Sequence, residues 1–444
     1  MLQRVFNKIV VIAILTACAG FAASAQTYGS YTPYSLYGIG DLHMQGTAYN
    51  KSMGGVGIAN RSMRYVNYLN PAAITERDSL SFMADVSLYQ DNKYFRQGDM
   101  KSVSNTFNIG DLVMTFPITS RNTAFMVGIA PYSGTGFGYK YNYDDPSVIG
   151  KTGNITYMAS GQGALYQAFA GAGVTFFNRL SIGAEAIYYF GKTEKTYAGS
   201  FSDSTFNGFE NGYTMSLTSL SGKFGIQYEQ PIGSGELCVG ATYTMGSDLK
   251  GYLDSYRFSS GAVVSDTLSF KSDTLAKTPG RLKLANEIGV GISYRYADKW
   301  MVEFDYTRSD WRNSGFDKVQ GFMGNATSSS GFSSFGASVS QAFRVGFEYV
   351  PNRNDSRYYF NTVSYRAGAY YKDDYFTIDG HKVNSMGITI GATFPVFRWF
   401  NGITFTVDIG QRGTTANNLI KEKYVNFSLG VNIFDIWFQK LQYD

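Results

Sequence analysis

The chain has few of the residues on which enzyme active sites depend. Only two histidines and two cysteines occur among its 444 residues, and His43 and His381 lie far apart in sequence. It has no Gly-x-Ser-x-Gly elbow, no His-Glu-x-x-His zinc motif and no phosphate-binding Walker loop. We therefore expect no enzyme activity, no catalytic residue, no metal site and no cofactor.

Charge and long apolar runs are also scarce. Charged residues make up only 16% of the chain, and the formal net charge is +4. After residue 25 there is no run of roughly 20 apolar residues, which is what a membrane-spanning helix requires. So small a positive charge is not typical of a nucleic-acid-binding surface, and we expect no nucleic-acid partner.

The first 25 residues have the pattern of a signal peptide. Arg4 and Lys8 precede an apolar stretch at residues 9–15, and small residues at 23–25 predict cleavage near Ala25. Cleavage would lower the net charge from +4 to about +2 and leave Cys238 as the last cysteine, so no internal disulfide is expected. Residues 15–18 also fit a lipoprotein box, and the sequence leaves open whether Cys18 is a lipoprotein cysteine.

The chain is instead rich in aromatic residues and glycine, with 35 tyrosines, 34 phenylalanines and 50 glycines. Many of these residues fall in segments where apolar and polar side chains alternate. In residues 425–433, for example, Val425, Phe427 and Leu429 alternate with polar or small residues. This period of two predicts a β-strand with one apolar face.

The alternation recurs often enough to build a large sheet. We predict fourteen strands, at residues 79–90, 104–118, 122–131, 163–177, 179–194, 213–230, 235–251, 281–297, 299–312, 336–351, 357–373, 382–397, 402–412 and 420–434. The connections between them alternate between short and long. That order is typical of a barrel with one end towards the periplasm and the other outside the cell.

These patterns together predict an all-β fold, a fourteen-stranded antiparallel transmembrane β-barrel in an outer membrane. Charges within the strands, such as Glu303, Asp305 and Arg344, fall opposite the apolar face. Because Arg or Lys on the lipid face costs roughly 2–4 kcal/mol near the midplane, we expect the charged side chains to point into the lumen.

The chain divides into four predicted parts. After the signal peptide at 1–25, residues 26–78 lack clean alternation and contain short glycine-rich stretches. A fourteen-stranded lumen is too wide to be filled by its own side chains, so we expect residues 26–78 to form an N-terminal hatch inside the barrel. The barrel spans residues 79–434, and residues 435–444 form a C-terminal tail.

Three motifs resemble the FadL family of outer-membrane transporters for hydrophobic compounds. The sequence Asn-Tyr-Leu-Asn-Pro-Ala-Ala at 67–73 is similar to the family's Asn-Pro-Ala motif, and residues 54–59 resemble its Gly-Gly-Ala stretch. Residues 127–134 resemble a glycine- and proline-containing region that follows the family's third strand. The barrel with an N-terminal hatch also matches the architecture that this resemblance implies.

The resemblance implies a function and a set of sites. The function is passive uptake of hydrophobic, fatty-acid-like small molecules, which leave sideways through the barrel wall into outer-membrane lipid. The implied sites are a hatch motif, a lateral opening and an apolar path. The hatch motif is Asn70, Pro71 and Ala72, the lateral opening is Gly128, Pro131, Gly134 and Gly136, and the path is Phe125, Ile129 and Phe137.

Two segments depart from the transporter pattern and leave an alternative open. The tyrosine-rich stretch at 34–41 is not part of the transporter hatch, and the chain continues past the last predicted strand. Some relatives of the family are partners in secretion or barrel-assembly machines. The alternative is therefore a non-transporting barrel subunit with outer-membrane protein partners, and the sequence does not identify the ligand or the partner.

Overall fold

The computed structural model describes residues 30–77, 80–119, 122–143, 146–203, 205–259, 262–270, 282–319, 321–322, 327–328, 331–332, 334–396 and 401–436. The predicted signal peptide, Cys18 and most of the predicted tail lie outside these residues.

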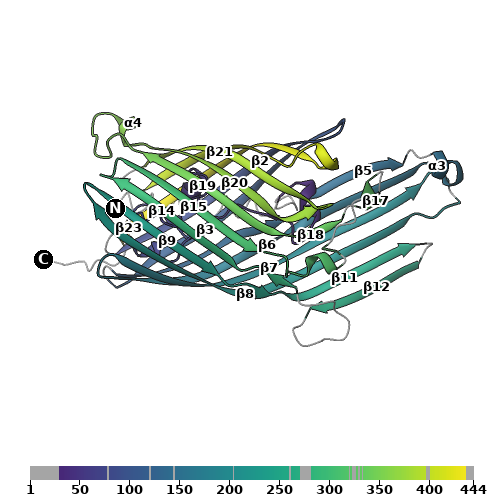
Figure 1. Cartoon of the computed structure of the whole chain (residues 1–444), viewed down its shortest axis with the longest axis horizontal. Helices are drawn as coiled ribbons and strands as arrows, with labels where there is room; N and C mark the ends of the chain where they lie inside the picture. The colour runs from purple at the N-terminus through teal and green to yellow at the C-terminus, as the bar shows by residue number, and fades with distance from the viewer. Residues whose placement is uncertain are drawn as a thin grey trace, which may run out of the picture.

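The wall of the molecule is a closed antiparallel barrel (Figure 1). Its fourteen strands are β2 (Ser81–Gln97), β3 (Met100–Thr119), β4 (Thr123–Gly134), β6 (Ile155–Phe176), β7 (Leu180–Phe201), β8 (Phe209–Ile232), β9 (Gly235–Thr244), β14 (Glu287–Tyr296), β15 (Trp300–Asp310), β19 (Val339–Tyr349), β20 (Ser364–Ile378), β21 (His381–Pro395), β22 (Gly402–Arg412) and β23 (Lys421–Ile436). The first and last of them pair, from Ser81 with Ile436 to Arg96 with Lys421, which closes the sheet. The predicted fold class is confirmed.

Several predicted outer loops are strands in the structure. β2 and β3 continue to a two-residue turn at Gly98 and Asp99, and β6, β7 and β8 are 22, 22 and 24 residues long. A transmembrane strand needs only about 9–11 residues, so these strands extend well beyond the membrane. The alternation weakens outside the membrane because neither face contacts lipid there, and the sequence therefore predicted loops.

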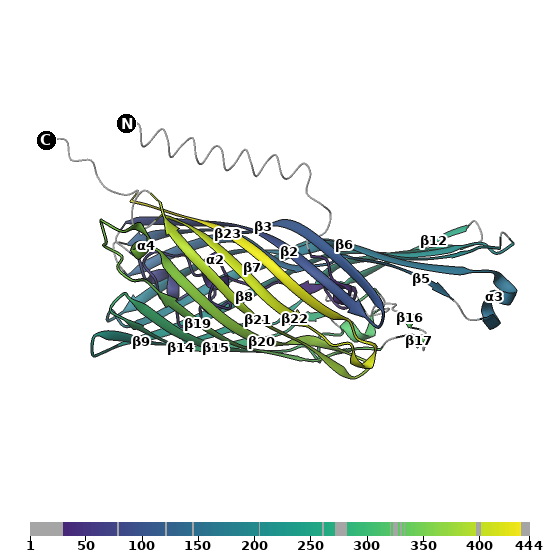
Figure 2. The same ribbon diagram turned by 90° about the horizontal axis from the view of Figure 1, so that it is seen from above.

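The extended strands form a sheet that projects from one side of the barrel (Figures 1 and 2). β5 (Phe137–Tyr143) pairs with the outer part of β6, and the hairpin of β11 (Lys250–Ser259) and β12 (Ala262–Phe270) pairs with β8. The other short elements outside the wall are α3 (Pro146–Thr152), β10 (Ser247–Asp248), β13 (Lys283–Leu284), η3 (Phe316–Lys318), β16 (Thr327–Ser328), β17 (Gly331–Phe332), β18 (Phe335–Ala337), α4 (Tyr359–Thr362) and η4 (Ala416–Asn418).

The two faces of the wall differ as the alternation predicts. Ile182 and Tyr188 on β7 and Phe304 on β15 are exposed on the outer face, whereas Glu303 and Asp305 are fully buried on the inner face. A closed ladder satisfies the backbone of the wall, so the outer face can be apolar and the lumen can hold charge.

Residues 30–77 lie inside the barrel, where Figure 2 shows them in purple. They include η1 (Pro33–Leu36), β1 (Asp41–Leu42), α2 (Ala48–Lys51) and η2 (Ala73–Thr75). The fit to the wall is close. A Cβ atom added to Gly368 of β20 would lie 2.2 Å from the backbone of Met53, and one added to Gly183 of β7 would lie 2.3 Å from that of Pro71. Glycines on the inner face thus let the two backbones approach.

The outer and inner faces should respond differently to charge. Val290, half exposed on the outer face in the middle of β14, is a suitable position to change. We expect Val290→Arg to lower the free energy of unfolding by about 2–4 kcal/mol, because the guanidinium would face hydrocarbon. Urea unfolding in lipid vesicles measures this.

Val264→Arg is the matched control, since Val264 is 67% exposed on β12, beyond the barrel. An equal loss of stability in both variants would show that Val290 does not face lipid.

Candidate functional site

The barrel wall contains one discontinuity that involves the predicted lateral opening. β3 pairs with β2 from Met100 to Thr115, but it pairs with β4 only from Leu112 to Thr119. Beyond the end of β4, β5 pairs with β6 and with no other described strand. The outer half of β3 and the whole of β5 therefore border a break in the ladder.

The cause of the break lies in β4. Pro131 has no backbone N–H to donate to a ladder. The pairing of β4 with β6 shifts register between Pro131 and Ser133, which marks a bulge. The last pair that β4 makes with β3 is Ile129 with Leu112, so β4 leaves β3 immediately before the proline.

The edge of β4 exposed by the break is covered by the chain's own N-terminal segment. β1 pairs with β4 through Asp41 with Gly134 and Leu42 with Ser133. The backbone N–H of His43 donates to Tyr132 O at 3.0 Å, and Gln45 Nε2 donates to Pro131 O at 3.1 Å. A short strand from inside the barrel thus takes the place that β3 has left.

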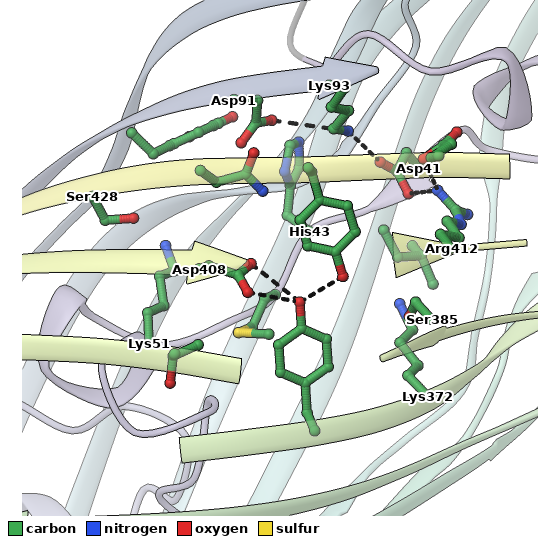
Figure 3. A pocket seen from close by; sticks show the side chains of 18 of the residues that line it. Asp41, His43, Lys51, Asp91, Lys93, Lys372, Ser385, Asp408, Arg412 and Ser428 are labelled. Carbon is green, nitrogen blue, oxygen red and sulfur yellow. Dashed lines mark hydrogen bonds and ion pairs between the residues drawn. The ribbon is translucent and has the colours of Figure 1, made fainter. Parts of the chain in front are cut away.

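Ion pairs hold β1 in this position (Figure 3). Arg412 Nη1 lies 2.9 Å from Asp41 Oδ1, and Lys93 Nζ lies 3.6 Å from Asp41 Oδ2. Arg412 also contacts Asp374 at 2.7 Å, and its guanidinium stacks 5.0 Å above the Tyr34 ring. Lys93 of β2 and Arg412 of β22 thus tie β1 to two wall strands besides β4, and Asp374 of β20 holds Arg412 in place.

A second anchor lies nearer to the outside. Lys195 lies on β7 beyond the lipid-facing stretch, and its Nζ donates to the carbonyl oxygens of Leu36, Gly38 and Gly321 at 2.8, 3.3 and 2.9 Å. Its burial lowers the pKa of the ammonium to about 7. Three carbonyl acceptors compensate part of this desolvation and fix the turn between η1 and β1.

A cavity of about 560 Å³ lies between the outer end of β3, β5 and the N-terminal segment. Aromatic and apolar side chains from separate elements line it, among them Tyr31, Phe95, Tyr139 and Ile378. Its charged lining residues are Arg96, Lys101 and Lys140, all basic. The break therefore opens onto a mainly apolar space with positive charge at its rim.

Deeper in the barrel, carboxylates of the wall bind the backbone of the hatch. Asp305 Oδ2 accepts hydrogen bonds from the N–H groups of Gly57 and Ile58 at 2.7 and 3.0 Å. Glu303 Oε1 accepts from Ala59 N at 2.9 Å. Three successive backbone N–H groups therefore find acceptors on β15, which fixes the glycine-rich stretch to the wall.

The predicted hatch motif lies in the barrel interior, beside β6, β7 and β8. Asn70 is fully buried, its Nδ2 donates to Ile58 O at 2.8 Å, and its Oδ1 accepts from Ala72 N at 3.0 Å. Pro71 packs against Gly183 of β7. The motif thus fixes one hatch loop to another, while residues 41–45 lie beside Pro131.

The other predicted site residues divide between the break and the outer face. Gly136 lies next to the N-terminal segment, where its carbonyl accepts from Thr32 N at 2.7 Å. Phe137 is fully buried, and the Cβ that Gly128 lacks would clash with Phe169. Phe125 and Ile129, however, are 38% and 40% exposed on the outer wall, so they point away from the lumen.

Sequence reasoning did not identify the residues that hold β1. Asp41, Lys93, Lys195 and Arg412 come from segments separated by up to 371 residues. The one available signal was the departure of residues 34–41 from the transporter hatch, because η1 and β1 are formed by these residues.

Comparisons with known proteins support the architecture. A family model described as BamG matches residues 5–444. Among solved structures, the toluene transporter TodX of Pseudomonas putida has a TM-score of 0.54 at 13% identity, covering 90% of this chain and 100% of that one. The toluene transporter TbuX of Ralstonia pickettii has a TM-score of 0.54 at 15% identity, covering 87% and 97%. A FadL homologue of Pseudomonas aeruginosa has a TM-score of 0.55 at 12% identity, covering 89% and 100%.

At such identities the solved structures establish the fold alone. The search of curated proteins found no match. None of the described helices has the length and apolar character needed to cross a membrane.

The buried amide of Asn70 offers a direct test of the hatch. Asn70→Ala removes the donor to Ile58 O and the acceptor for Ala72 N, and leaves both backbone groups without these partners. We expect a loss of about 1–3 kcal/mol in the free energy of unfolding, with faster proteolysis of residues 53–73. Asn354→Ala, at an exposed turn after β19, should change neither. Equal behaviour of the two variants would contradict a structural role for the motif.

Proposed function

The chain belongs to the BamG family, and from this premise we propose that it is a non-transporting barrel subunit of an outer-membrane protein complex of the secretion or barrel-assembly kind. The observation that carries this proposal is the closure of the break at β4. The chain covers its own lateral opening with β1, and buried ion pairs hold β1 there.

A solute leaving through the break would have to displace this seal. Arg412, Asp41 and Lys93 are all buried or nearly so, and breaking a buried ion pair by removing one partner costs roughly 3–5 kcal/mol. Lys195, the second anchor, additionally holds the turn before β1 through hydrogen bonds to Leu36 O and Gly321 O. A seal with these anchors favours a fixed structural element over a gate that opens on each passage.

The hatch behind the seal is also fixed on several sides. Glu348 of β19 contacts Arg366 at 2.8 Å. The Arg366 guanidinium lies 4.5 and 4.6 Å from the rings of Tyr49 and Tyr65, which stack on each other. Together with Glu303 and Asp305, these residues tie the hatch to the neighbouring strands β15, β19 and β20. Gln227 of β8 adds a contact from another part of the wall, because its Nε2 donates to Ile58 O at 2.9 Å. This arrangement supports a barrel whose interior serves stability.

The sheet outside the membrane supplies the surface that a subunit needs. β5, β11, β12 and the outer parts of β6, β7 and β8 project beyond the barrel mouth on one side (Figures 1 and 2). A passive channel does not require so large an asymmetric extension, whereas a docking subunit gains contact area from it.

Co-purification tests this proposal. We expect the tagged chain, extracted from its native outer membrane in a mild detergent, to retain at least one protein partner in fixed stoichiometry. A tagged unrelated barrel treated in the same way is the control for non-specific capture. Purification of the chain alone at every detergent concentration would overturn the proposal.

One observation favours a second candidate, the passage of hydrophobic small molecules. The cavity of about 560 Å³ at the break is within the range of roughly 300–1,000 Å³ that is usual for small-molecule sites. Its aromatic lining suits an apolar ligand, and the solved structures named above include toluene transporters. In this case β1 would have to move aside.

The Asp41→Ala variant separates the two candidates. It removes the ion pairs of β1 with Arg412 and Lys93 and so weakens the seal. For a subunit we expect unchanged uptake of a labelled fatty acid by cells that express the variant, because no transport path depends on the seal. Asp254→Ala, at an exposed position on β11, is the matched control. Uptake that rises only in Asp41→Ala would favour the channel.

A further inference from the structure

The turn between β19 and β20 is longer than a strand reversal requires. Three other described connections at the barrel end opposite the projecting sheet consist of residues 177–179, 233–234 and 297–299, whereas β19 and β20 are joined by residues 350–363 (Figures 1 and 2). This longer segment, which contains α4, is called the α4 turn below. Two or three residues suffice to reverse an antiparallel chain, so the α4 turn contains more chain than the reversal needs.

The large aromatic residues of the α4 turn lie on its surface. Tyr358 and Phe360 are each 68% exposed, and Tyr359 is half exposed. By contrast, Val350 and Val363, at the two ends of the turn, are fully buried. The turn therefore buries its smaller apolar residues and exposes its largest ones. A cluster of exposed large apolar side chains indicates an interaction surface.

Hydrogen bonds within the α4 turn fix its shape. Asp355 Oδ1 accepts from the backbone N–H groups of Arg357 and Tyr358 at 2.8 and 3.0 Å. The two halves of the turn are joined where Asn352 N donates to Asn361 O at 2.9 Å. Because the backbone is held in this way, the exposed position of the aromatic residues is set by the fold of the turn.

Two further hydrogen bonds place α4 beside the outer face of the wall. Tyr365 lies on the outer face of β20, next to Arg366, which is buried on the inner face. The Tyr365 hydroxyl donates to Phe360 O at 3.1 Å. The Tyr359 hydroxyl donates to Pro395 O, at the end of β21, at 2.9 Å. The α4 turn therefore packs against the ends of β20 and β21, next to the outer face.

The outer face carries a row of aromatic residues at this level. Tyr296 of β14 pairs with Trp300 of β15, Trp300 pairs with Tyr349 of β19, and Tyr349 pairs with Tyr365 of β20. Aromatic rows on the outer face of a transmembrane barrel mark the boundary between lipid and water. Because Tyr365 also binds Phe360 O, the α4 turn lies at this boundary.

We propose that the α4 turn is a membrane-surface anchor, in which Tyr358 and Phe360 insert into the headgroup layer of the lipid beside the aromatic row. Arg357 is exposed next to Tyr358, and its guanidinium suits a lipid phosphate. The ligand is therefore a phospholipid, bound where headgroups and acyl chains meet. An anchor on one side of the barrel would fix its tilt in the membrane. This inference goes beyond the proposed function and applies equally to a subunit and to a channel.

Spin labelling in vesicles of phosphatidylethanolamine and phosphatidylglycerol tests the inference. One nitroxide label is attached to Phe360→Cys and one to Asn354→Cys, the control in the same turn. Asn354 follows Arg353, whose Nη2 contacts Glu348 of the inner face at 3.2 Å, so this half of the turn lies towards the lumen. Cys238 is buried, and the chain without an added cysteine is the labelling blank. We expect the label at 360 to collide mainly with oxygen, which dissolves in lipid, and the label at 354 mainly with a water-soluble nickel complex.

Heat-modifiable migration of each variant confirms that its barrel is folded. Equal accessibility of both labels to the nickel complex would overturn the inference. A photo-cross-linking probe in place of Phe360 extends the test to native membranes, where we expect lipid adducts. Protein adducts as the main product would show that a protein covers the α4 turn, and would overturn the inference as well.

Discussion

The structure depends on one constraint, that every backbone hydrogen-bonding group of a wall in lipid must find a partner within protein. Fourteen strands meet this constraint by closing on themselves, with β2 against β23. Pro131 violates it locally, because it ends the pairing of β3 with β4 and leaves two strand edges. Several distinctive features of the molecule lie around that point, including β1, the ion pairs of Asp41 and the aromatic cavity.

The need for a hatch follows from the width of the closed barrel. A fourteen-stranded barrel encloses more space than its inward side chains fill, and the N-terminal segment occupies that space with little regular secondary structure. Backbone groups of such a segment need partners that helices and strands would otherwise provide. Glu303 and Asp305 accept three consecutive N–H groups, and Asn70 and Gln227 both donate to Ile58 O. The carboxyl and amide side chains of the lumen are therefore structural partners of the hatch.

Much of the fold could be predicted from the sequence because lipid imposes alternation on every spanning strand. The fourteen strands, their order and the inward direction of Glu303 and Asp305 follow from that rule alone. The rule fails where lipid ends, and residues 195–201 and 252–258 therefore read as loops although they belong to β7 and β11. Phe125 and Ile129 illustrate a further limit, because apolar residues near a predicted opening belong to the lipid face by default.

The arrangement of the candidate site was less accessible to sequence reasoning, since it is made of contacts between distant segments. A motif identified the residues near the break, yet the groups that close it, Asp41, Lys93 and Arg412, carry no local signature. The contacts among these residues depend on the shear of the barrel and on the path of the hatch. A short stretch of sequence encodes neither. A local pattern does show where regular strand pairing is interrupted, as at Pro131. From such a violation physical reasoning can continue, because a strand edge that loses its neighbour needs another partner, and β1 provides one for β4.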